Sequence, residues 1–249
     1  MLKFGEQTDL DGLKRVAKML LHTDVGLTDY SPVIVQHPFT SCGIVAGEIL
    51  GAEGLVDITE SSENLEKWQS FMEKQIDKVK NSMALFMMIN KPYAMLFVKF
   101  ASPFLSRKDF SILLADAWVR SEAPNRDPNI TKRQLVEMFR SADRNDLMTE
   151  EEISALDRFD DPITIFRGVT PYNENDLLAL SWTLNKDKAK WFAERFGEKG
   201  KVYEAEICKQ YILAFFSGRG EDEVVVDPKH LQNITLSAGQ HQGGGMTLI

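Results

Sequence analysis

The chain has 249 residues, of which 43% are hydrophobic and 27% charged, which is the composition of an ordinary globular protein with enough residues to bury a core. Its net charge is −8, and its Lys and Arg residues form no dense stripe anywhere in the sequence. This pattern argues against a protein that binds nucleic acid mainly by neutralising phosphates, although it leaves room for a small local basic site.

The sequence favours a protein of the cytoplasm. Its two cysteines, Cys42 and Cys208, lack nearby His or Cys at zinc-ligand spacing, so we expect no metal site. The N-terminal stretch MLKFGEQTDLDG has acids where a signal peptide needs an apolar region. The most apolar stretches, 83–89 and 94–98, are far shorter than the ~20 residues that span a bilayer. We therefore expect no membrane contact.

The first part of the chain is predicted to be rich in helices. Apolar residues at helical spacing predict helices over 8–22, over 62–80, over 109–121 and from Thr131 onward. The almost wholly apolar segment 83–100 is expected to be buried, and residues 31–35 to form a short strand. Residues 40–56 are rich in small residues and predict a packed turn or helix, because their glycine spacing does not fit a phosphate-binding loop.

A helix is also predicted to begin at Thr149. The segment 143–152 faintly resembles a calcium-binding loop, but Met148 stands where such a loop needs glycine for its sharp turn. Thr149 and Glu152 have instead the spacing of a capping box, in which two residues satisfy each other's backbone donors at a helix start. The sequence therefore predicts a helix here and no calcium site.

After Asp161-Pro162 the pattern changes to strands. Strands are predicted over 163–169, 180–184, 201–208, 211–217, 224–226 and 233–236. One helix interrupts them over 185–197, with Asn185 as its N-cap and Gly197 at its end. A helix-rich part followed by a strand-rich part predicts an α+β fold.

This division predicts four regions. We expect an N-terminal extension of unknown role (1–60), a helical lobe (61–160), a β-rich core (161–238) and a flexible glycine-rich tail (239–249).

Polar residues gather at the ends of the predicted strands. Arg167-Gly168 closes an apolar strand, where a guanidinium is costly without an anionic partner and is well suited to a phosphate. In the next strand, Ser181 and Thr183 share one face and Trp182 points to the other. Taken singly, these are ordinarily a solvated arginine and a pair of surface hydroxyls.

Three acids precede the apolar strand 224–226. If Glu221 and Glu223 enter this strand in extended form, they share a face and Asp222 turns away. The plain alternative is an exposed acidic edge. The order of these motifs along the chain carries more information than any one of them.

That ordered set resembles the arginine–serine–glutamate class of ADP-ribosyltransferases. The matching stretches are FRGV (166–169), LSWTL (180–184), AKWFAERF (189–196) and GEDEVVV (220–226), and the resemblance covers roughly residues 100–237. It implies a helical N-terminal part packed on a mixed, mostly antiparallel split β-sheet. The chain is also similar in its general look to proteins encoded by phages and prophages.

The resemblance implies a role for each matching residue. Glu223 would hold the ribose 2′-hydroxyl of NAD and stabilise the positive charge that builds on the ribose as nicotinamide leaves. Ser181 would orient Glu223, Arg167 would bind the NAD phosphates, and the Gly168 backbone would contact the nicotinamide amide. Glu221 would face the nucleophile of the acceptor.

Two departures from the family pattern are visible. The serine motif is often Ser-Thr-Ser, whereas Trp182 and Thr183 stand here at its second and third positions, so only Ser181 carries over directly. Trp182 and Thr183 remain candidates for binding NAD. Residues 1–60 have no counterpart in the family pattern.

The resemblance implies a mono-ADP-ribosyltransferase that uses NAD as co-substrate and needs no metal. Its acceptor would be a macromolecule, a protein rather than a nucleic acid, modified at arginine or another nitrogen nucleophile. Two alternatives stay open: an NAD glycohydrolase, in which water is the acceptor, and a non-catalytic phage interaction or structural protein that retains the fold.

Overall fold

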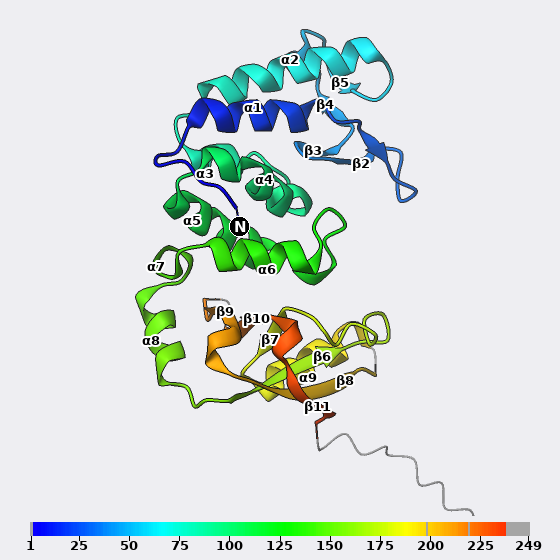
Figure 1. The fold of residues 1–249 in the computed structure, drawn as a ribbon. Coiled ribbons are helices and arrows are strands. Elements are labelled where there is room, and N and C mark those ends of the chain that lie inside the picture. The colour runs from blue at the N-terminus through cyan, green and yellow to red at the C-terminus, as the bar shows by residue number, and fades with distance from the viewer. Residues whose placement is uncertain (1, 198, 219, 238–249) are drawn as a thin grey trace, which may run out of the picture. The chain divides into compact units, whose positions relative to one another are not determined.

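The computed structural model describes residues 2–197, 199–218 and 220–237, and its fold is α+β (Figure 1). Its internal contacts group the chain into two units. Unit 1 contains residues 1–122, 127–130 and 141–143, and unit 2 contains residues 123–126, 131–140 and 144 onward. The predicted tail, 239–249, lies outside the described residues.

Unit 1 is built on amphipathic and buried helices. They are α1 (Leu10–Leu21), α2 (Ser62–Lys78), α3 (Ser82–Phe86), α4 (Ala94–Ala101) and α5 (Arg107–Arg120). The predicted helices in 8–22, 62–80 and 109–121 are confirmed, and the side chains of Asp9, Ser61 and Ser106 cap them. The apolar segment 83–100, predicted to be buried, is buried only in part, because Met87 and Phe100 are more than half exposed. A 3₁₀ turn over Lys91–Tyr93 divides it.

Unit 1 also contains short strands that the sequence only partly predicted. Strands β1 (Gly26–Leu27), β2 (Ile34–His37) and β3 (Thr40–Cys42) form one antiparallel sheet, and β4 (Ile44–Ala46) pairs with β5 (Leu55–Asp57). The prediction of a packed turn or helix over 40–56 was therefore wrong at these strands, whereas Gly47–Leu50 between them forms a 3₁₀ helix. Strands of three residues are too short for alternation to reveal them.

The observed grouping differs from the predicted boundaries. Helix α1 packs against α2 and α4, so residues 1–60 do not form a separate extension. In addition, most of the chain between 123 and 160 groups with the β-rich part instead of with the preceding helices.

The helical elements of unit 2 come from both sides of the predicted boundary. They are η4 (Pro124–Arg126), α6 (Lys132–Ser141), α7 (Arg144–Leu147), α8 (Glu150–Arg158) and α9 (Lys186–Glu194). The capping box of Thr149 and Glu152 is confirmed at the start of α8, and Asn185 caps α9 as predicted. Helix α8 packs against the edge strand of the sheet, β9 (Ile212–Phe216).

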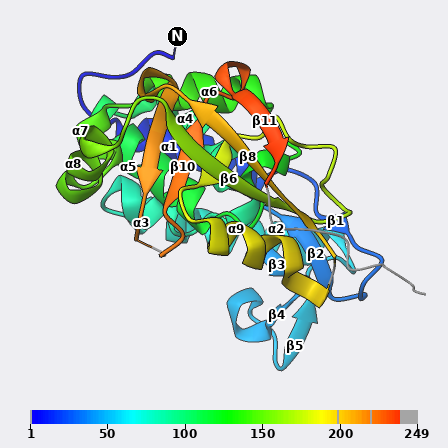
Figure 2. The ribbon, with the colours of Figure 1, turned by 90° about the horizontal axis from the view of Figure 1, so that it is seen from below.

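The sheet of unit 2 has six strands in the order β11-β8-β6-β7-β10-β9. Figure 2 shows β11, β8 and β6 side by side. Its other strands are β6 (Ile163–Val169), β7 (Ser181–Thr183), β8 (Lys201–Ile207), β10 (Glu223–Val226) and β11 (Gln232–Leu236). All the described pairings in this sheet are antiparallel, which corrects the prediction of a mixed sheet. Strands β6 and β7 share only the pair Phe166↔Thr183, so the sheet divides there into two three-stranded halves.

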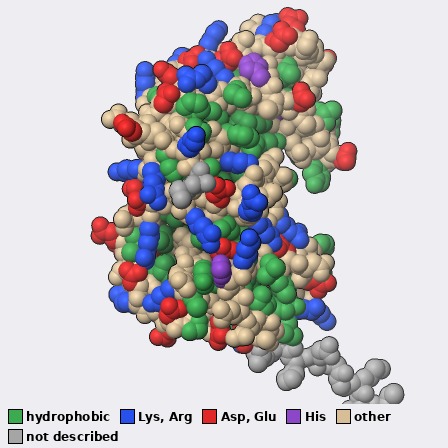
Figure 3. Space-filling model, in the orientation of Figure 1, with side chains coloured by type: hydrophobic (Ala, Val, Ile, Leu, Met, Phe, Trp, Pro, Cys, Tyr) green, Lys and Arg blue, Asp and Glu red, His purple; other side chains and the backbone are tan. Residues whose placement is uncertain are grey.

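Charge is distributed unevenly along the chain. Residues 19–66 of unit 1 carry eight acids and neither Lys nor Arg, which accounts for the whole net charge of −8. On the face drawn in Figure 3, acidic and basic side chains are mixed within each unit. No helix among the described residues is long and apolar enough to cross a membrane.

Candidate active site

Three of the predicted site residues are brought together where the two halves of the sheet meet. Ser181 on β7 donates a hydrogen bond from Oγ to Oε1 of Glu223 on β10, at 2.5 Å. Arg167 on β6 donates from Nη1 to the backbone oxygen of Ser181, at 2.6 Å. Three neighbouring strands therefore contribute one guanidinium, one hydroxyl and one carboxylate to a single cluster.

The strand register explains this meeting. In the β7–β10 pair, Ser181 lies opposite Val225 and Thr183 lies opposite Glu223. Ser181 and Glu223 are therefore diagonal neighbours on one face of the sheet, within reach of a short side-chain hydrogen bond. A slip of one residue would turn Glu223 to the other face and break the cluster.

Arg167 is a half-buried cation with unused hydrogen-bonding capacity. Its Nε–H is buried and has no hydrogen-bond partner, although buried polar groups are nearly always paired. Burial lowers the pKa of Arg167 to about 10, and the nearby carboxylates of Asp176 and Glu223 oppose that shift. The guanidinium therefore stays protonated at neutral pH. Its buried Nε–H distinguishes Arg167 from a fully solvated strand-end arginine.

Two further arginines lie near enough to act on Arg167. The positive charges of Arg126 and Arg195 both contribute to the lowered pKa of Arg167. Three guanidiniums repel one another, and a bound anion would relieve that repulsion while supplying acceptors for their N–H groups. The cluster therefore has the electrostatic character of an anion site.

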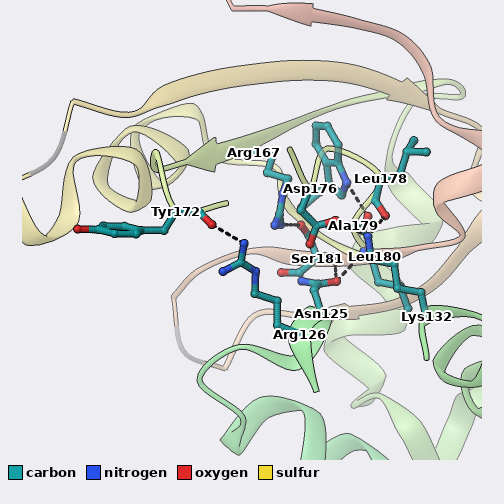
Figure 4. Close-up of polar contacts among 11 residues, drawn as sticks. Asn125, Arg126, Lys132, Arg167, Tyr172, Asp176, Leu178, Ala179, Leu180 and Ser181 are labelled. Carbon is teal, nitrogen blue, oxygen red and sulfur yellow. Dashed lines mark hydrogen bonds and ion pairs between the residues drawn. The ribbon is translucent and has the colours of Figure 1, made fainter. Parts of the chain in front are cut away.

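The 170–181 segment beside Arg167 is held by side chains from earlier in the chain (Figure 4). Asn125 Oδ1 accepts hydrogen bonds from the backbone nitrogens of Leu180 and Ser181, and Arg126 donates to the backbone oxygen of Tyr172. Lys132 pairs with Asp176 and donates to the backbone oxygen of Leu178. These contacts fix the backbone of the residue that binds Glu223.

Sequence reasoning missed these supporting residues. The stretch PNRDPN (124–129) has the composition of a simple loop, and Arg195 falls within the predicted helix over 185–197, so neither stands out in the sequence. Asn125 contacts a residue 56 positions further along the chain, and no local pattern signals such a contact.

Gly168 has a packing role that the sequence did not predict. A Cβ at this position would lie 1.9 Å from the backbone oxygen of Ala189 and 2.7 Å from the backbone nitrogen of Ala193, both on α9. Glycine is therefore required so that α9 can pack directly on β6. A contact of its backbone with nicotinamide stays a prediction.

Trp182 and Thr183 lie differently from the rest of the cluster. Trp182 is 2% exposed, and its indole N–H donates to the backbone oxygen of Ala179, so this side chain belongs to the core. The hydroxyl of Thr183 donates to the backbone oxygen of Glu221 at 2.6 Å and accepts from the backbone nitrogen of Asn185. Both side chains are engaged within the protein.

Glu221 lies before β10, not within it. The strand begins at Glu223, and Asp222 has a φ of 45°, in the left-handed region. The extended E-x-E geometry that would align Glu221 with Glu223 is therefore absent. A turn carries Glu221 instead, and the Thr183 hydroxyl fixes its backbone.

The described residues contain no group of three or more His, Cys, Asp or Glu arranged to hold a metal ion. Comparison with known proteins found no matching family model, no matching curated protein and no matching solved structure.

Proposed function

We propose that this protein is a mono-ADP-ribosyltransferase, which cleaves NAD at the nicotinamide–ribose bond and transfers ADP-ribose to a nitrogen nucleophile of a macromolecule, most simply a protein. The observation that carries this proposal is the short hydrogen bond from Ser181 Oγ to Glu223 Oε1 beside the half-buried Arg167. The residue types and their order along the chain had suggested the same chemistry.

The arginines suit the diphosphate of NAD. Arg167 has a buried Nε–H without a partner, and Arg126 and Arg195 lie close enough to perturb its pKa. A diphosphate would offer acceptors to that N–H and offset the mutual repulsion of the three cations. Binding energy gained there can orient the rest of the substrate.

Glu223 is the group suited to the bond-breaking step. NAD supplies the chemistry of a cationic nicotinamide leaving group, whose departure puts positive charge on the ribose. A carboxylate held in place before the reaction stabilises such charge without having to reorganise. The hydroxyl of Ser181 keeps one oxygen of Glu223 hydrogen-bonded and thereby fixes the orientation of the carboxylate.

Glu221 is the group suited to orienting and deprotonating the acceptor nucleophile. It lies two residues before Glu223 on a turn whose backbone is held by Thr183. A carboxylate there can orient a nitrogen nucleophile and accept its proton as the new bond forms.

The proposal is tested by incubating the protein with NAD labelled in the adenine moiety and a cell lysate, and then measuring nicotinamide and the distribution of label. We expect nicotinamide release together with label on protein. Label only in free ADP-ribose would support a glycohydrolase, label on nucleic acid would change the acceptor class, and no NAD consumption would support the non-catalytic alternative.

A further inference from the structure

One buried carboxylate, Glu152, lies outside the cluster described above. It is 7% exposed and occupies the third position of α8. Its Oε2 accepts a hydrogen bond from the backbone nitrogen of Thr149 at 3.0 Å, which completes the capping box. A capping box explains one of its oxygens and does not require burial.

The second oxygen of Glu152 binds a distant part of the chain. Oε1 accepts from the backbone nitrogen of Ser217 at 2.8 Å and from the Ser217 hydroxyl at 3.3 Å. Ser217 is the first residue after β9, 65 positions away from Glu152. A buried carboxylate with donors on both oxygens is strongly held, and it holds its donors equally well.

Ser217 in turn begins the turn that carries Glu221. Its backbone oxygen accepts from the nitrogen of Gly220 at 2.8 Å. Gly220 has a φ of 64°, which glycine adopts freely, whereas Asp222 has a φ of 45°, which a non-glycine residue adopts only where its surroundings enforce it. Glu152 therefore fixes Ser217, the residue at which this turn starts.

The other end of the turn is fixed by β7. Thr183 donates to the backbone oxygen of Glu221, and the nitrogen of Leu184 donates to the backbone oxygen of Asp222 at 3.1 Å. The backbone next to Glu221 is thus held from two elements, α8 through Glu152 and β7 through Thr183.

The position of Glu223 depends less on this turn than the position of Glu221 does. It lies in β10 between Thr183 of β7 and Phe216 of β9, and its side chain is bonded to Ser181. Glu221 lies outside the strand pairing, so loosening the turn moves Glu221 before it moves Glu223.

We propose that Glu152 is a positioning residue for Glu221. Through Ser217 it holds the turn in the geometry that presents Glu221 to the acceptor, and it thereby favours transfer to the acceptor over transfer to water. This inference rests on the proposed function, and it extends the site to a side chain that touches neither substrate.

The test compares Glu152→Ala, Glu152→Gln and Thr149→Ala. The alanine at 152 removes the bonds to Ser217, whereas Gln keeps one acceptor for them. Thr149→Ala is the matched control, because it weakens the same cap of α8 without touching Ser217. Two quantities are measured: the ratio of label transferred to nicotinamide released, and the rates of hydrogen exchange at the amides of Ser217, Gly220 and Leu184.

We expect Glu152→Ala to lower the transfer ratio about 10- to 100-fold, the scale of a small misplacement of a reacting group. Nicotinamide release should stay within about threefold of wild type, a change of under ~1 kcal/mol in barrier. Exchange at the three amides should become faster, Gln should restore part of both effects, and Thr149→Ala should change neither.

The outcomes separate this inference from the function on which it rests. Unchanged amide exchange in Glu152→Ala overturns the anchoring of the turn, whatever the protein catalyses. Faster exchange with an unchanged transfer ratio overturns the link to the acceptor. A wild-type protein that consumes no NAD refutes the proposed function itself, and with it the effect on transfer, while the exchange rates still decide whether Glu152 holds the turn.

Discussion

At the scale of single residues, Gly168 belongs to a sequence motif, yet the packing of α9 on β6 alone requires glycine at this position. Because a Cβ there would lie 1.9 Å from the Ala189 oxygen, Gly168→Ala must push α9 away from β6. We expect a loss of about 1–3 kcal/mol in unfolding free energy or more, measured by thermal or urea unfolding. Gly218→Ala is the matched control, because a Cβ there would meet no atom within 4 Å. Equal stability of the two variants would contradict the packing role.

His37, at the end of β2, makes the stability of unit 1 depend on pH. Its Nδ1 accepts from the backbone nitrogen of Phe39, so Nε2 carries the proton and donates to the backbone oxygen of Leu21. Burial lowers the pKa of His37 below its ordinary value of 6.5. The neutral ring therefore contributes stability that is fully present above pH 6.5 and is lost as the pH falls below it.

The measurement is the unfolding temperature of wild type and His37→Gln between about pH 5 and 8, the interval in which histidine titrates. Gln can keep one donor and one acceptor but does not titrate. We expect the wild type to lose stability more steeply on acidification than the variant. Parallel curves would show that His37 is not the titrating group.

At the scale of elements, Thr183 links β7 to the turn before β10. Thr183→Val keeps the shape but removes the donor to the Glu221 oxygen and the acceptor for the Asn185 nitrogen. We expect a loss of about 1–2 kcal/mol in stability and a lower transfer rate, with the KM for NAD unchanged. Thr183→Ser, which keeps the hydroxyl, is the control. A raised KM with transfer otherwise intact would instead support the predicted contact of Thr183 with NAD.

The sequence predicted local elements well because their signals are local. Strand β6 has the predicted bounds, and α8 and α9 begin at the predicted caps. The turn at Asp222 could not be predicted, because the contacts that enforce its φ come from Thr183 and Leu184, about 40 positions earlier.

The pairing between strands is the other feature that the sequence could not predict. The sequence placed Ser181 and Glu223 near each other only through a family resemblance, since alternation gives the face of each residue but not the register of its neighbour. Asn125 and Glu152 lay in segments with a complete local explanation, a loop and a helix cap. Their long-range bonds therefore left no sign in the sequence.

At the scale of the whole molecule, the β-rich part is completed by residues that precede it. Met148, Glu152 and Arg140 bind Phe215, Ser217 and Asp227 respectively, and Asn125 binds the start of β7. Removing such partners leaves buried polar groups unsatisfied, at about 1–3 kcal/mol each. Several losses of this size approach the 5–15 kcal/mol that stabilises a typical protein.

We therefore predict that a fragment beginning at residue 161 does not fold cooperatively, whereas one beginning at residue 123 does. The measurement is a thermal melt of both fragments followed by circular dichroism, with the full chain as reference. A cooperative melt of the shorter fragment near the temperature of the longer one would contradict the grouping of residues 123–160 with the sheet.

The most direct test of the proposed function is nicotinamide release and label transfer from NAD by wild type, Glu223→Gln, Glu221→Gln and the exposed control Glu151→Gln. Gln at 223 keeps an acceptor for the Ser181 hydroxyl but loses the charge. We predict that Glu223→Gln lowers both activities by about 10²–10³ while still binding NAD. Glu221→Gln should lose transfer and keep slow nicotinamide release, and Glu151→Gln should match wild type. Activity of Glu223→Gln within about threefold of wild type, under ~1 kcal/mol of barrier, would contradict the assignment of the site.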